Sequence, residues 1–148
     1  MNVTDINSMY KEAEGLERTL GIEFISTPEA DTVMATMPVD SRNVQPYGYL
    51  NGGATVALAE TLAGVGSILL APGHICVGMS ITASHLRPAR NGDTVTALAR
   101  VIHKGRQTHL WRVDVSDGAG HTISPINVTN FKTDQEGRTQ WDTTHTTG

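Results

Sequence analysis

Residues 43–86 carry almost no formal charge, and this feature constrains the fold of the chain more than any other. The stretch contains no Asp, Lys or Arg and a single Glu, Glu60. Charged residues make up 18% of the whole chain, so about eight would be expected here. A carboxylate that stands alone among apolar and small side chains is costly to bury. Glu60 therefore either pairs with a group distant in sequence or is kept for chemistry.

Residues 52–70 of this stretch are predicted to form one long helix, ended by Ala71-Pro72-Gly73. Apolar residues surround almost its whole circumference, so we expect it to be buried on all sides. The remaining chain is typical of strands, at 22–26, 32–37, 75–86, 94–103, 108–116 and 122–131. Strands joined by short turns favour an antiparallel sheet. The sequence therefore predicts an α+β fold, with a six-stranded antiparallel sheet wrapped around a long central helix.

The length of 148 residues predicts one domain, which we place at residues 1–132. Apolar residues at helical spacing predict an N-terminal helix over residues 5–20, with Gly21 as its stop. Residues 133–148 are polar and rich in Thr, and we expect them to form a flexible C-terminal tail.

Composition argues against several classes of protein. The net charge is −4 and no basic run occurs, which is unlike a nucleic-acid-binding surface. The single cysteine, Cys76, fits a reducing compartment. Residues 1–17 lack the basic segment and apolar run of a signal peptide, and no apolar stretch reaches about 20 residues. The histidines show no metal-ligand spacing. We expect a cytoplasmic protein that binds no metal, membrane or nucleic acid.

The loop that opens the central helix reads Gln45-Pro46-Tyr47-Gly48-Tyr49-Leu50-Asn51-Gly52-Gly53, and Ala59-Glu60-Thr61 follows within the helix. Together with the order of elements, these residues resemble the hotdog-fold acyl-CoA thioesterases of the PaaI-like kind over roughly residues 23–132. The nearest patterns are those of the Glu-dependent 4-hydroxybenzoyl-CoA, the dihydroxynaphthoyl-CoA and the enterobactin proofreading thioesterases. The resemblance implies a homodimer with a continuous sheet, assembled into a homotetramer. It also implies an acyl-CoA, or an acyl- or aryl-carrier-protein thioester, as substrate.

The resemblance implies roles for residues around the start of the helix. Gly52 offers its backbone N–H to the thioester carbonyl, Glu60 is the nucleophile or general base, and Gln45 lies near the carbonyl. Asn51 stands where two of these families have His, and its amide can donate a hydrogen bond but cannot transfer a proton near neutral pH. Gly64 stands where they have a hydroxyl residue. Both differences bear on the rate rather than on the type of reaction.

Two physical arguments apply to the same residues. Without a Cβ at Gly52 and Gly53, a substrate can approach the unpaired N–H groups and the positive end of the helix, although a plain loop-to-helix turn is the alternative. Eight residues of helix separate Gly52 from Glu60, which is about 12 Å and too far for both to contact one carbonyl. Two helices antiparallel at a dimer axis would bring each Glu60 to the other's Gly52. The alternative is a structural Glu60 bonded to backbone or to an Arg.

Coenzyme A needs cations for its phosphates, and basic residues gather at two turns of the predicted sheet. The resemblance suggests that both turns border the CoA channel together with Met79 and His85. The residues concerned are Met79, His85, Leu86, Arg87, Pro88, Ala89, His103, Lys104, Gly105, Arg106, Gln107 and Thr108. The two turns follow consecutive strands and lie at opposite ends of the predicted sheet, so two subunits of a dimer could offer both turns to one ligand more readily than one subunit could. Solvated turns without a ligand are the alternative. Coenzyme A would be part of the substrate, and we expect no cofactor.

The predicted function is hydrolysis of an acyl-CoA thioester to a free acid and CoA, with an aromatic or hydroxyaromatic acyl group favoured. The sequence leaves open whether Glu60 attacks the carbonyl or deprotonates a water. An alternative is an acyl-CoA or acyl-carrier-protein binding hotdog protein with weak or no hydrolysis. A hydratase on the same fold would require an Asp/His pair in the loop before the helix. Residues 43–53 contain neither residue, which argues against that activity.

Overall fold

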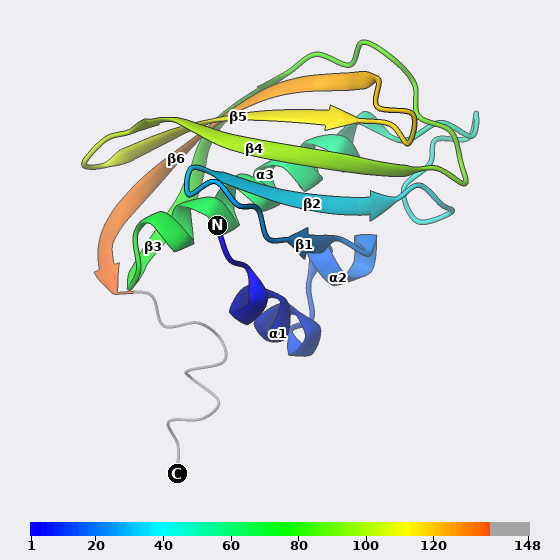
Figure 1. Ribbon diagram of the computed structural model, residues 1–148. Coiled ribbons are helices and arrows are strands. Elements are labelled where there is room, and N and C mark those ends of the chain that lie inside the picture. The colour runs from blue at the N-terminus through cyan, green and yellow to red at the C-terminus, as the bar shows by residue number, and fades with distance from the viewer. Residues whose placement is uncertain (137–148) are drawn as a thin grey trace.

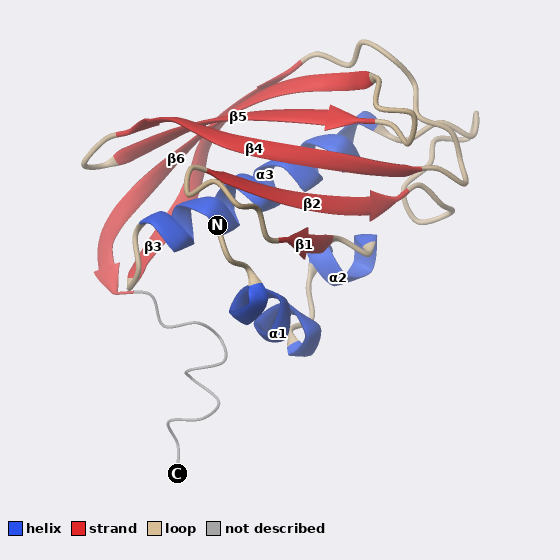
Figure 2. Ribbon diagram, viewed as in Figure 1, coloured by secondary structure: helices blue, strands red, loops and turns tan. Residues whose placement is uncertain are grey.

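The computed structural model describes residues 1–136, in which one antiparallel sheet curls over a long helix (Figure 1). The elements in chain order are α1 (Thr4–Glu12), α2 (Leu16–Leu20), β1 (Glu23–Ile25), β2 (Thr32–Pro38), α3 (Gly52–Leu70), β3 (His74–Ala83), β4 (Thr94–Lys104), β5 (Thr108–Ser116) and β6 (Thr122–Glu136). The strand order is β1-β2-β4-β5-β6-β3, and every pairing is antiparallel (Figure 2). The predicted fold class is confirmed.

The core lies between α3 and the middle strands of the sheet. Side chains alternate inward and outward along β2, β4 and β5, and the inward ones are buried. Several of them are alanines, including the cross-strand neighbours Ala35 and Ala97, so α3 can approach the sheet closely. Leu58, Leu62 and Val65 of α3 fill this space. Burying each such large aliphatic side chain contributes about 1.5–3 kcal/mol to folding.

Helix α3 is not buried on all sides, and that prediction was wrong. Val56, Glu60, Gly64 and Ile68 recur every four residues along one side, and none of them is buried by residues 1–136. The sheet covers only the opposite side, because its six strands form an open layer whose edge strands, β1 and β3, do not pair with each other. By length and composition, the 19 residues of α3 could also cross a membrane, which we had not expected. The central helix of a soluble domain passes the same test, so this is weak evidence for a membrane span.

A buried polar cluster joins the second half of α3 to β5 and β6. Ser67 Oγ accepts hydrogen bonds from Trp111 Nε1 at 2.9 Å and from Asn130 Nδ2 at 3.0 Å, and it lies 2.9 Å from His109 Nδ1. The two N–H groups occupy both lone pairs of the Ser67 oxygen, so its hydroxyl proton points at His109 Nδ1. His109 is then neutral, with its proton on Nε2. Trp111 is completely buried and belongs to the core.

Burial also changes the titration of two groups near this cluster. The pKa of His109 is lowered by burial, and the positive charges of Lys104 and Lys132 act in the same direction. Burial raises the pKa of the Cys76 thiol, whose Sγ lies 3.7 Å from the Ser67 carbonyl oxygen. Cys76 is therefore poorly suited to act as a nucleophile.

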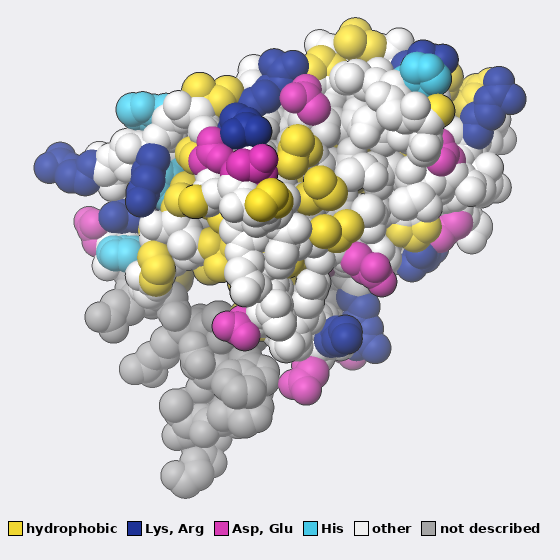
Figure 3. All heavy atoms as spheres, viewed as in Figure 1, with side chains coloured by type: hydrophobic (Ala, Val, Ile, Leu, Met, Phe, Trp, Pro, Cys, Tyr) yellow, Lys and Arg dark blue, Asp and Glu magenta, His cyan; other side chains and the backbone are white. Residues whose placement is uncertain are grey.

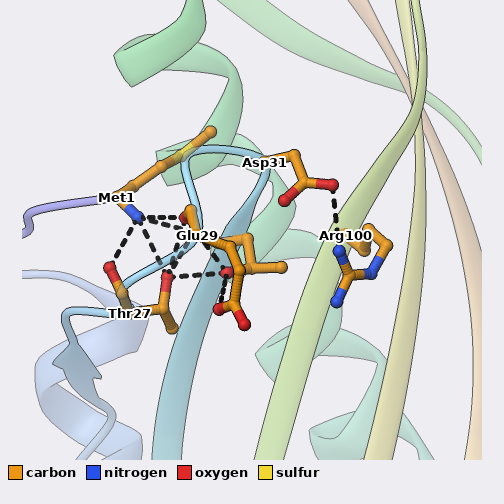
Figure 4. Close-up of polar contacts among 6 residues, drawn as sticks. Met1, Thr27, Glu29, Asp31 and Arg100 are labelled. Atoms are coloured by element: carbon orange, nitrogen blue, oxygen red, sulfur yellow. Dashed lines mark hydrogen bonds and ion pairs between the residues drawn. The ribbon is translucent and has the colours of Figure 1, made fainter.

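The two edges of the sheet differ. At the β1 edge, the amide of Asn7 replaces a strand, because Asn7 Nδ2 donates to Phe24 O at 2.8 Å and Phe24 N donates to Asn7 Oδ1 at 3.3 Å. The segment before α1 lies beside the β1–β2 turn, where the Met1 ammonium donates to Thr27 and to the carbonyls of Glu29 and Thr32 at 2.8–3.1 Å (Figure 4). At the other edge, β3 pairs with β6 alone within residues 1–136. The β3 edge is therefore open, whereas the β1 edge is closed.

Both ends of the chain differ from the sequence prediction. The single helix expected at residues 5–20 is two helices, because Ala13 and Gly15 are extended. Gly21 ends the second helix as expected, with φ 73°. Residues 133–136 of the expected tail belong to β6, where Thr133 Oγ1 donates to Ile75 O at 2.9 Å. The rest of that tail, residues 137–148, lies outside the described residues.

Candidate active site

The loop before α3 is held in place by a buried asparagine. Asn43 Nδ2 donates to Pro38 O at 2.8 Å, and the Asn43 carbonyl accepts from Asn51 N at 2.8 Å. Gly48, with φ 84°, closes a turn in which its N–H donates to Gln45 O at 2.9 Å. These bonds set where the loop meets the helix, and the sequence analysis did not single out Asn43.

The N-terminus of α3 has one free amide. Asn51 caps the helix, because its Oδ1 accepts from Gly53 N at 2.8 Å and its carbonyl accepts from Ala54 N and Thr55 N at 3.0 and 3.2 Å. The N–H of Gly52 has no acceptor among residues 1–136. An unpaired N–H at the positive end of a 19-residue helix is suited to bind an oxygen that carries negative charge.

A cavity of about 320 Å³ lies at this end of α3. It is lined by Gln45, Tyr49, Leu50, Gly52, Thr55, His85, Leu86, Arg87, Pro88, Ala89, Ile123 and Ser124. Two groups that the sequence analysis treated separately thus meet here, namely the catalytic candidates Gln45 and Gly52 and the predicted CoA-binding segment 85–89. Tyr49 takes part in the lining, whereas Tyr47 is 82% exposed and does not.

His85 lies directly over Gly52. A Cβ added to Gly52 would be 2.6 Å from His85 Nε2, so only glycine leaves room for the imidazole there. The other ring nitrogen, Nδ1, lies 2.7 Å from Ser124 Oγ. Ser124 is 1% exposed and was missed by the sequence analysis, although a serine between the buried Ile123 and Ile126 of β6 was a signal that could have found it.

Glu60 is exposed in the single chain, contrary to the burial expected from its apolar surroundings. Its carboxylate lies against β3, because a Cβ added to Gly78 would be 2.5 Å from Glu60 Oε1. The pairing of β3 with β6 shifts between Gly78 and Ser80, which leaves Met79 in a bulge beside this carboxylate. Glu60 makes no hydrogen bond or ion pair with any described residue. It does not line the cavity at Gly52.

The second predicted CoA-binding segment lies elsewhere. His103, Lys104, Gly105, Arg106, Gln107 and Thr108 form the hairpin between β4 and β5, closed by Gly105 N donating to Thr108 O at 2.8 Å. Figure 1 shows this hairpin at the end of the sheet far from the start of α3, separated from segment 85–89 by the length of β4. None of the six residues lines the cavity at Gly52. Within one subunit, the two turns therefore lie at opposite ends of the sheet, as expected.

Comparison with known proteins decides the family. Residues 47–124 match the thioesterase superfamily. The chain belongs to the thioesterase superfamily. The crystal structure of a mutant of the thioesterase PA1618 from Pseudomonas aeruginosa superposes with a TM-score of 0.82 and 37% identity, covering 89% of this chain and 94% of that one. The 1,4-dihydroxy-2-naphthoyl-CoA hydrolase of Escherichia coli is 43% identical over 100 residues, 67% of this chain and 73% of that protein. The Streptococcus mutans protein smu.793, solved with bound acetyl CoA, has a TM-score of 0.71 and 25% identity over 78% of this chain and 91% of its own.

Membership of this superfamily assigns thioester hydrolysis to the protein, which confirms the predicted class of enzyme. The superfamily match spans the loop at residues 47–51, all of α3 and β3, and the segment up to Ser124. The roles of the individual residues, including Gly52 and Glu60, stay predictions. Within one chain, the Gly52 amide and the Glu60 carboxylate, neither of which has a hydrogen-bond partner among the described residues, lie at two separate places.

Proposed function

We propose that this thioesterase hydrolyses an acyl-CoA thioester to a free acid and CoA at a site shared by two subunits. One observation carries the proposal: among residues 1–136, Gly52 keeps a free N–H at a cavity, while Glu60, about 12 Å further along the same helix, keeps a free carboxylate. Two such groups are useful to one carbonyl only if they come from different chains. The proposed dimer supplies that arrangement.

The sheet edges support the manner of dimerisation. The β1 edge is closed by Asn7, whereas β3 is open and exposes Val77 and Met79, at 46% and 58%. Two β3 strands paired antiparallel about a two-fold axis would make one continuous sheet. Glu60 lies against Gly78 of this open strand, so it faces the proposed interface. The same axis would bring it toward the N-terminus of the partner's α3.

The proposed chemistry follows from the groups present. Negative charge builds on the carbonyl oxygen as the thioester is attacked, and one fixed donor such as the Gly52 N–H stabilises it by roughly 3–4 kcal/mol. Gln45, which lines the same cavity, supplies a second donor. Glu60 of the other subunit either attacks the carbonyl carbon to form an anhydride that water then hydrolyses, or takes a proton from the attacking water. In both routes the C–S bond breaks and the thiolate of CoA takes up a proton.

The proposed substrate carries a nucleotide at one end and an aromatic acyl group at the other. Arg87 at the cavity, together with Lys104 and Arg106 of the partner's hairpin, would neutralise the phosphates of CoA. Tyr49 and Leu50 give the cavity an apolar part that suits an aromatic or hydroxyaromatic acyl group. The E. coli relative named for a hydroxylated naphthoyl-CoA supports the same choice. No cofactor takes part in this scheme, and we place the enzyme in the cytoplasm.

A second candidate is an acyl-CoA or acyl-carrier-protein binding protein that hydrolyses slowly. Asn51 favours it, since its side-chain amide cannot transfer a proton near neutral pH and its Oδ1 is occupied in capping the helix at Gly53. Release of thiol from benzoyl-CoA, hydroxybenzoyl-CoA and the matching acyl-carrier proteins distinguishes the two. Turnover below one per minute on the whole panel, with tight binding retained, would favour the binding protein.

Mixing two inactive variants tests the shared site. Glu60→Gln removes the carboxylate, and we expect at least a hundredfold loss of kcat with the fold retained. Gly52→Pro removes the N–H at the first position of the helix, where proline is tolerated, and we expect a loss of similar size. Gly52→Ala keeps the N–H but places a Cβ against His85 as proline does, so it measures the steric part of the loss, which the loss in Gly52→Pro should exceed. A heterodimer of the two variants has one intact site and one doubly defective site. After unfolding and refolding together in equal amounts, half of the dimers are mixed, so about a quarter of the wild-type activity returns.

Two outcomes would contradict the proposal. Failure of the refolded mixture to exceed either variant alone, with dimers present by light scattering, would exclude a site made from two chains. Near-normal turnover of Glu60→Gln would exclude Glu60 as the reacting carboxylate. The same light-scattering measurement tests the expected homotetramer, for which the mass is four times 15.8 kDa.

A further inference from the structure

The contact between His85 and Gly52 has a third member that the proposed mechanism does not use. His85 Nε2 lies against Gly52, 2.6 Å from where a Cβ of that residue would be, and His85 Nδ1 lies 2.7 Å from Ser124 Oγ. Ser124 belongs to β6, and 39 residues of chain separate it from His85. His85 is exposed, whereas Ser124 is 1% exposed, so the ring reaches from a buried anchor into the cavity.

The buried hydroxyl decides which nitrogen of His85 carries the proton. His85 Nδ1 is the hydrogen-bond partner of Ser124 Oγ within residues 1–136, and no other is formed there. If Nδ1 carried the proton, the Ser124 O–H would be a buried donor without an acceptor, which is unfavourable. The favoured arrangement therefore has Ser124 donating to a bare Nδ1 and the proton on Nε2. A neutral imidazole then carries its N–H donor on the nitrogen that lies beside Gly52, at the cavity that both residues line.

We propose that His85 is a catalytic residue that donates its Nε2–H to the thioester carbonyl oxygen beside the Gly52 N–H, and that Ser124 is the positioning residue that sets the tautomer and orientation of His85. This inference rests on the proposed function and deepens it. Asn51 does not offer its side-chain oxygen to this space, because that oxygen accepts from Gly53 N. No proton is transferred by His85 in this scheme; it remains a neutral donor throughout, an arrangement that other enzymes use to polarise a carbonyl.

The proposal is tested by nitrogen NMR together with kinetics. In 15N-histidine-labelled wild type at a pH where the ring is neutral, we expect the His85 shifts of a bare Nδ1 and a protonated Nε2. In Ser124→Ala the two shifts should move toward each other as both tautomers become populated, and Ser124→Thr, which keeps the hydroxyl, should retain the wild-type shifts. Ser84→Ala is the matched control, since Ser84 is the exposed residue next to His85.

The kinetic expectation is specific to a positioning role. Loss of an oxyanion donor costs about a hundredfold or more in kcat, which we expect for His85→Ala. Ser124→Ala should lower kcat about tenfold with KM changed less than about twofold, and the double variant should be no slower than His85→Ala, because both changes remove one donor. Ser84→Ala should match wild type.

The outcomes separate this inference from the function it rests on. A wild-type enzyme that is active but carries the His85 proton on Nδ1 would overturn the inference and leave the function standing. Additive losses in the double variant would also overturn the role of Ser124. A wild type that has the expected tautomer but hydrolyses no thioester of the panel would instead refute the proposed function.

Discussion

Two glycines in α3, two residues apart, provide a test of how the helix packs on the sheet. A Cβ added to Gly66 would lie 2.6 Å from Cζ2 and 3.0 Å from Cζ3 of Trp111, and nearer still to Cη2. Trp111 is completely buried and its indole N–H donates to Ser67. At Gly64 an added Cβ would meet no atom of residues 1–136 within 4 Å. The two substitutions to alanine therefore change helix propensity alike and packing very differently.

The expected stability change of Gly66→Ala is the sum of three contributions. Alanine stabilises a helix interior by about 1 kcal/mol relative to glycine. Overpacking costs about 1–3 kcal/mol. If the ring moves, its buried N–H loses its acceptor at a cost of about 1–3 kcal/mol. The net effect is a destabilisation of about 3 kcal/mol, or a fall in Tm of roughly 6–12 °C for a domain of this size. Gly64→Ala, with the first contribution alone, should be stabilised by about 1 kcal/mol.

Urea unfolding followed by tryptophan fluorescence measures both variants, at one protein concentration because a dimer would unfold in a concentration-dependent way. A Gly66→Ala protein as stable as wild type would refute the packing of Trp111 against α3. An unchanged midpoint with a changed m-value would not count, since it would report on the unfolded state.

Three further predictions concern the site and the buried cluster. Gly78→Ala should displace the Glu60 carboxylate with little loss of stability, because only the flexible end of the Glu60 side chain must move. We expect kcat to fall at least tenfold while the urea midpoint is unchanged. An unchanged kcat would contradict the placement of Glu60. Because the pKa of His109 is lowered in the fold, the unfolded chain binds the proton more tightly, so the contribution of His109 to the free energy of unfolding should be complete above the unfolded pKa of about 6.5 and be lost as the pH falls below it. Unfolding at pH 7.5 and 5.5 measures this loss, which His109→Gln should remove. An equal change between the two pH values in wild type and variant would contradict a buried neutral ring. Arg106→Glu should raise KM for a CoA thioester more than for its pantetheine analogue, with Arg18→Glu as the control; equal increases would argue against a phosphate contact.

Much of the fold could be predicted because its signals are local. The alternation along 108–116 predicted β5 with its observed bounds, and residues 52–70 predicted α3 with its observed bounds. The end of the N-terminal helix could not be predicted in this way. Ala13 and Gly15 interrupt it, although the apolar spacing continues across the break, since spacing alone does not tell one helix from two in succession.

The site likewise has some features that the local sequence predicts and others that only the fold decides. The sequence by itself determined that Gly52 begins a helix and that Glu60 lies about 12 Å further along, because both follow from the regular geometry of one helix. Only the tertiary structure decided that Glu60 is on the uncovered side of α3, beside an open strand. It also decided that Ser124 anchors His85 over Gly52. Contacts of this kind depend on sheet curvature and on strand register, where a shift of one residue turns every side chain to the other face.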